Sequence, residues 1–114
     1  MTQDPRAPLE APDTLADLVD YQSGAVVSRV LLKRETGSLT LFAFDAGEGL
    51  SEHTTPHDAI VQVLEGTAEV TVAAIRHRVE TGHALHLPAD VPHAVFAPER
   101  FKMLLTMWRM RRSG

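Results

Sequence analysis

Residues 47–66 read GEGLSEHTTPHDAIVQVLEG, and residues 82–93 read GHALHLPADVPH. Each stretch begins at a glycine, which indicates a turn, and contains a short apolar run with histidine next to it. Because side chains alternate between the two faces of an extended chain, His53 and His57 share a face if the first stretch is extended. That face continues with small apolar residues, Ala59, Val61 and Val63. The two stretches therefore predict short strands that direct histidine into the interior of a β-fold.

The same pattern extends over most of the chain. Short β-branched and apolar runs alternate with turn residues at intervals of about ten, which is typical of an all-β sandwich or barrel. The expected strands cover residues 25–32, 38–44, 59–64, 68–73, 75–79, 84–87, 95–96 and 101–108. Asp13 or Thr14 is placed to cap a short N-terminal helix that continues to Val19. We predict one barrel domain over residues 13–108, a flexible arm at 1–12 and a basic C-terminal tail at 109–114.

Several of these strands carry large apolar residues on both faces. In residues 38–44, Leu39 and Leu41 point one way, and Phe42 and Phe44 point the other way. A single barrel has one interior, so its outer face needs a second covering layer. A second copy of the chain would provide this layer in a homodimer. The alternative is that the short N-terminal helix covers the outer face.

Composition restricts the class of protein. The chain has 114 residues, of which 44% are hydrophobic and 23% are charged, as in one ordinary globular domain. The net charge of −4 gives no electrostatic signature of nucleic-acid binding, and the lack of cysteine excludes disulfides and thiolate metal sites. No apolar run approaches the roughly 18 residues of a membrane span. We therefore expect a cytoplasmic protein whose partners include no nucleic acid and no membrane.

The two histidine stretches resemble the paired motifs of the cupin superfamily. Matching positions of the first motif are Gly47, His53 and Gly66, and those of the second are Gly82, Pro88 and His93. The resemblance covers roughly residues 38–105, most of the folded chain. It implies a small antiparallel jelly-roll β-barrel, a metal site at the barrel mouth and frequent dimerisation.

The chain departs from the family pattern at other motif positions. Thr55 stands where the family has its second histidine, and Ala59 stands where it has a glutamate. Asp90 and Ala97 replace the glycine and the asparagine of the second motif. Two of the usual metal ligands are therefore absent. His57 is the candidate replacement, because it lies two residues beyond Thr55 and on the same face of an extended chain.

His53, His57 and His93 are thus the predicted ligands of one divalent transition metal. Imidazole suits Zn, Fe, Ni and Cu, so the ligand set leaves the identity of the metal open. Three protein ligands leave positions for water or substrate. Such a site would suit a metal-dependent oxidoreductase of the dioxygenase type or an isomerase acting on a small molecule. The alternatives are a non-catalytic small-ligand-binding or sensing barrel with a degenerate metal site, and a structural dimer.

The neighbours of these histidines bear on that choice. Thr55, Ala59 and Val61 are expected to line a pocket that is poor in acids and bases, which weakens the enzyme hypothesis. Asp58 is placed to orient an imidazole from behind. His86, two residues before Pro88, is a candidate for supporting a metal ligand without touching the metal, or for lying at an interface. Neither the substrate nor the reaction follows from these residues.

Overall fold

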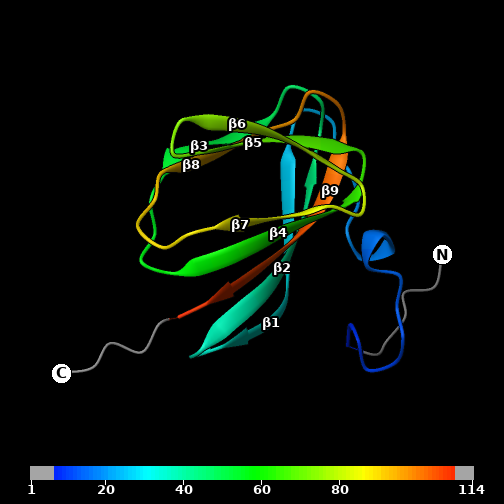
Figure 1. Cartoon of the computed structure of the whole chain (residues 1–114). Coiled ribbons are helices and arrows are strands. Elements are labelled where there is room, and N and C mark those ends of the chain that lie inside the picture. Colours follow the sequence, from blue (N-terminus) through cyan, green and yellow to red (C-terminus); the bar gives the residue numbers. More distant parts are fainter. Residues whose placement is uncertain (1–6, 110–114) are drawn as a thin grey trace.

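The computed structural model describes residues 7–109, so the outer parts of the predicted arm and tail, 1–6 and 110–114, lie outside the described residues. Within the described part, one short 3-10 helix, η1 (Leu15–Leu18), precedes nine β-strands (Figure 1). The strands are β1 (Val26–Arg34), β2 (Gly37–Phe44), β3 (Gly49–His53), β4 (Asp58–Glu65), β5 (Thr67–Val72), β6 (Ile75–Glu80), β7 (Ala84–Leu87), β8 (His93–Phe96) and β9 (Phe101–Trp108).

The strands form two antiparallel sheets that face each other (Figure 1). The five-stranded sheet has the order β1-β2-β9-β4-β7, and the four-stranded sheet has the order β3-β8-β5-β6. At one end of the molecule, residues 54–57 and 88–92 carry the chain from one sheet to the other. We call this end the barrel mouth. The fold is the all-β jelly-roll barrel that the sequence predicts.

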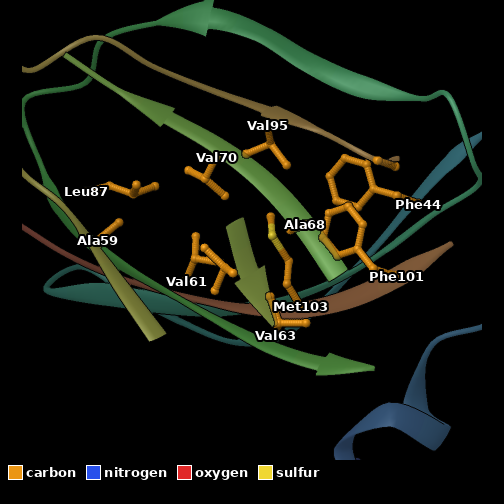
Figure 2. Close-up of a cluster of buried hydrophobic side chains, with 12 residues drawn as sticks. Phe44, Ala59, Val61, Val63, Ala68, Val70, Leu87, Val95, Phe101 and Met103 are labelled. Carbon is orange, nitrogen blue, oxygen red and sulfur yellow. The ribbon is translucent and has the colours of Figure 1, made fainter. Parts of the chain in front are cut away.

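The interior of the barrel is apolar. Figure 2 shows side chains from both sheets pointing into one common core. Alternate residues of each strand supply these side chains, as in β4, where Ala59, Val61 and Val63 are buried. Phe44 and Phe101 stack in this core with ring centroids 4.4 Å apart and an interplanar angle of 9°. The inward-facing residues that the alternation predicts therefore form the core.

The N-terminal segment covers the outer face of the five-stranded sheet. Val19 is buried there in a second apolar cluster with Leu41, Ala43 and Leu104. Lys102 fastens the segment, because its Nζ donates a hydrogen bond of 2.7 Å to the carbonyl of Ala16. The two-faced pattern of β2 is confirmed, and its outer side packs against the N-terminal segment. The predicted homodimer is therefore not required to cover this face.

Two local predictions need correction. The N-terminal helix is a single 3-10 turn, and Thr14 makes no capping hydrogen bond with its side chain. The chain is not continuously extended from His53 to Val63, because β3 and β4 belong to different sheets. The prediction also missed β3, in which Leu50 is the one large apolar residue.

No helix among the described residues is long and apolar enough to cross a membrane.

Candidate ligand site at the barrel mouth

The barrel mouth is built by the two segments that pass between the sheets. The backbone N–H of Asp90 donates a hydrogen bond of 2.7 Å to the carbonyl of Thr55, which ties the two segments together. One segment begins after His53 at the end of β3, and the other ends at His93, the first residue of β8. Both histidines therefore lie at the mouth, although 40 positions separate them in the sequence.

A β-bulge decides which side chain of β3 faces His93. Leu50 pairs with Val95, and His53 pairs with His93, so β3 contains one residue more than β8 over this interval. In a regular ladder Glu52 would stand opposite His93. The extra residue shifts the alternation and places His53 there instead. A bulge has no simple sequence signature, so parity counting along β3 could not have predicted this pairing.

The two imidazole rings lie against each other. Their centroids are 4.4 Å apart, and the rings meet edge to face at 69°. Nδ1 of His53 is 2.8 Å from the carbonyl oxygen of Ser51, and Nδ1 of His93 is 3.1 Å from that of Val91. A carbonyl oxygen only accepts hydrogen bonds, so in both rings Nδ1 carries the proton. The remaining nitrogen, Nε2, is then unprotonated in each neutral ring and is free to bind a metal ion or a ligand donor.

Burial disfavours the charged form of His93. Only 7% of the surface of this residue is exposed. Removal from water lowers the pKa of His93 below its usual value, and the neighbouring His53 lowers this pKa further, while the hydrogen bond to Val91 acts in the opposite direction. The uncharged ring is the form that binds metal ions.

His57, the third predicted ligand, lies just before β4. Its backbone is held by Thr55, whose hydroxyl donates to the carbonyl of His57 at 3.1 Å and accepts from its N–H at 3.3 Å. Nδ1 of His57 is buried and has no hydrogen-bond partner among the described residues. Within residues 7–109, however, no group of three or more His, Cys, Asp or Glu side chains is arranged to hold a metal ion. The structure thus pairs His53 with His93, and the role of His57 as a ligand stays a prediction.

Asp58 and His86 form a separate pair. Oδ1 of Asp58 lies 2.8 Å from Nε2 of His86 and accepts a second hydrogen bond, of 3.2 Å, from the backbone N–H of Ala89. The His86 ring lies parallel to that of Trp108, with centroids 6.5 Å apart. The hydrogen bond from His86 is the main reason why the pKa of Asp58 is lowered. Asp58 therefore orients His86 and none of the predicted ligand histidines.

The interior behind the histidine pair offers few polar groups. Ala59 and Val61 are buried on the inner face of β4, and their role in lining a pocket stays a prediction. Among the described residues, the buried polar or charged side chains are His93 and Lys102. Lys102 points to the outer face, where it contacts the N-terminal segment. His93 is thus the one buried polar side chain of the described interior.

Comparison with known proteins agrees with this architecture. The family model of the cupin domain matches residues 40–108. A conserved protein of unknown function from Streptococcus pyogenes is 33% identical, with 91% of this chain and 90% of that chain covered and a TM-score of 0.82. A cupin superfamily protein from Desulfitobacterium hafniense is 30% identical, with coverages of 90% and 94% and a TM-score of 0.85.

A third similar structure is a cupin 2 conserved barrel domain protein from Leptotrichia buccalis. It is 39% identical and has a TM-score of 0.80, with 82% of this chain and 46% of that longer chain covered. A search of the curated proteins found no match. The family model and these identities show that the chain belongs to the cupin family.

Proposed function

We propose that this cupin is a non-catalytic protein that binds a small molecule at the barrel mouth. A divalent transition metal held by His53 and His93 anchors the ligand, and His57 serves as the third protein ligand. The observation that carries the proposal is the adjacent pair of imidazoles whose Nδ1 atoms are both engaged by backbone carbonyls, which leaves both Nε2 atoms available. The buried, unpartnered Nδ1 of His57 supports its part in the site, because such an atom is costly to leave unbonded.

Different residues of the chain have different roles in binding. The carbonyls of Ser51 and Val91 fix the orientation of the two rings, as hydrogen bonds to the second ring nitrogen do in other metal sites. The apolar side chains behind the pair, including Ala59 and Val61, exclude water. When bound, the metal supplies a Lewis-acidic position for an oxygen or nitrogen atom of the ligand.

The composition of the interior favours binding over a dioxygenase or isomerase reaction. Proton transfer needs an acid or base within hydrogen-bond distance of the reacting atom. Behind the histidine pair, the described core is formed by aliphatic and aromatic side chains and by Met103. Apolar walls with a few fixed polar groups are typical of small-molecule binding sites.

Calorimetric titration of untagged protein with Zn²⁺ and Ni²⁺ tests the proposal. The parent should bind about one equivalent of metal. His93→Ala should weaken metal binding by roughly tenfold or more, because even the loss of a residue that only hydrogen-bonds to a metal ligand costs that much. His57→Ala should weaken binding as well, because His57 is the third proposed ligand. His83→Ala is the matched control, because this histidine is exposed and follows the Gly82 turn. Absence of saturable binding by the parent, or equal affinity in His93→Ala, would contradict the metal site.

A further inference from the structure

The inner face of the five-stranded sheet continues past the core toward the barrel mouth. Ser38 and Thr40 lie on this face, because they alternate with the outward-facing Leu39 and Leu41. Ser38 pairs with Met107 of β9, and Met107 pairs with Ala59 of β4. A continuous surface therefore leads from the buried core of the barrel to the β1–β2 end of the sheet.

A cavity of about 210 Å³ lies on this surface. Its lining includes Lys33, Arg34, Ser38, Thr40 and Arg109, and we call it the cationic pocket. Three strands supply these residues or their immediate continuation. Lys33 stands opposite Ser38 in the β1–β2 ladder. The backbone N–H of Arg109 donates a hydrogen bond of 2.9 Å to the carbonyl of Thr36, so the first residue of the predicted basic tail is fixed against the β1–β2 turn.

Within the described part of the chain, the three cations of this pocket have no acidic partner. No ion pair joins Lys33, Arg34 or Arg109 to a carboxylate of the described residues, and no acidic residue lines the pocket. Three arginines outside the pocket do have acidic partners: Arg76 pairs with Glu69 at 3.1 Å, Arg78 with Glu80 at 3.2 Å, and Arg100 with Asp45 at 2.8 Å. The whole chain carries a net charge of −4, so this concentration of positive charge is local.

We infer that the cationic pocket binds the phosphate group of a small molecule. Guanidinium groups present several donors in a plane that matches phosphate oxygens, the Lys33 ammonium adds a compact charge, and the hydroxyls of Ser38 and Thr40 add neutral donors. Three cations balance the double charge of a phosphate monoester better than the single charge of a carboxylate. The inference deepens the proposed function and rests on it in one respect, namely that the ligand enters at the barrel mouth.

Titration of the full chain with inorganic phosphate, followed by backbone amide NMR, tests the inference. At constant ionic strength the parent should show saturable shifts centred on residues 37–40 and 109. Lys33→Gln combined with Arg109→Gln should raise the dissociation constant by about tenfold, since two charge-assisted contacts are lost. The matched control, Arg76→Gln combined with Arg78→Gln, removes the same charge from the opposite sheet and should stay within about twofold of the parent. Acetate should bind at least about tenfold more weakly than phosphate.

Several outcomes would overturn the phosphate assignment. These are the absence of saturable shifts in the parent, an equal loss in both double variants, or equal affinities for acetate and phosphate. Chemical shift dispersion in each variant reports that the barrel is folded. His53→Ala combined with His93→Ala separates this inference from the proposed function. That variant should lose metal binding and keep phosphate binding, whereas the Lys33 and Arg109 variant should do the reverse.

Discussion

Single residues set the geometry of the mouth through the backbone around them. The bulge in β3 turns His53 toward His93, and the carbonyls of Ser51 and Val91 select the protonated nitrogen in each ring. The bulge lies between Leu50 and His53, and the two carbonyls belong to the residues two positions before each histidine. A substitution at Ser51 that keeps the backbone path should therefore leave the orientation of His53 unchanged.

Among the glycines that the structure describes, Gly66, between β4 and β5, is the one where an added side chain is least tolerated. Its φ is +75°, and an added Cβ would clash with the carbonyl oxygen of Arg100 and lie 2.9 Å from Cβ of Phe101. Gly66→Ala should destabilise the protein by about 3 kcal/mol, because the backbone strain and the clash add together. Urea unfolding measures this loss.

Gly24 provides the control for this prediction. It has a similar φ of +68°, but an added Cβ would meet no atom within 4 Å. Gly24→Ala should therefore cost about 1 kcal/mol, the conformational strain alone. Equal losses for the two substitutions would show that the close approach to Arg100 does not matter.

At the scale of elements, the N-terminal segment acts as a cover for the outer face of the five-stranded sheet. Val19 is 4% exposed, and the neighbouring Lys102 and Arg29 donate hydrogen bonds to carbonyls of this segment at 2.7 and 2.8 Å. Lys102 also lies 4.9 Å from the centroid of the Tyr21 ring. The segment is thus held by both apolar packing and polar contacts, in spite of having one helical turn.

Val19→Asp should detach this segment. An aspartate in the second apolar cluster would be buried without a partner, at a cost of about 3 kcal/mol. Urea unfolding should report the loss of stability, and binding of a hydrophobic dye should report the exposure of Leu41 and Leu104. Asp20→Asn, at the exposed neighbouring position, should stay within about 0.5 kcal/mol of the parent. Unchanged stability and dye binding in Val19→Asp would mean that the segment contributes nothing to the fold.

At the scale of the whole molecule, alternation and turn spacing were sufficient to predict an all-β sandwich or barrel, and the resemblance to the cupin motifs selected the jelly-roll barrel. The inward and outward residues of β2 follow from counting alone, and the structure confirms them. Counting failed between His53 and Asp58, where the chain leaves one sheet for the other. Counting residues also could not predict the hydrogen bond between Asp58 and His86, because neither segment's sequence indicates that β4 pairs with β7.

The cationic pocket was missed for the same reason. Its cations lie at the end of β1 and just after β9, and only the β1–β2–β9 ladder brings them together. In the sequence Arg109 reads as the start of a basic tail. Long-range strand pairing is thus the information that local patterns lack. Homodimerisation, predicted from the two-faced strands, stays a prediction that sedimentation velocity would check.

The most direct test of the account is NMR of the imidazole nitrogens with and without Zn²⁺. The central claim is that His53 and His93 bind the metal through Nε2 while Nδ1 keeps its proton and its carbonyl partner. Addition of Zn²⁺ should shift the Nε2 signals of both histidines and leave both Nδ1 atoms protonated, with His77, His83 and His86 unchanged. Shifts confined to those three histidines, or no shift in any ring, would contradict the claim.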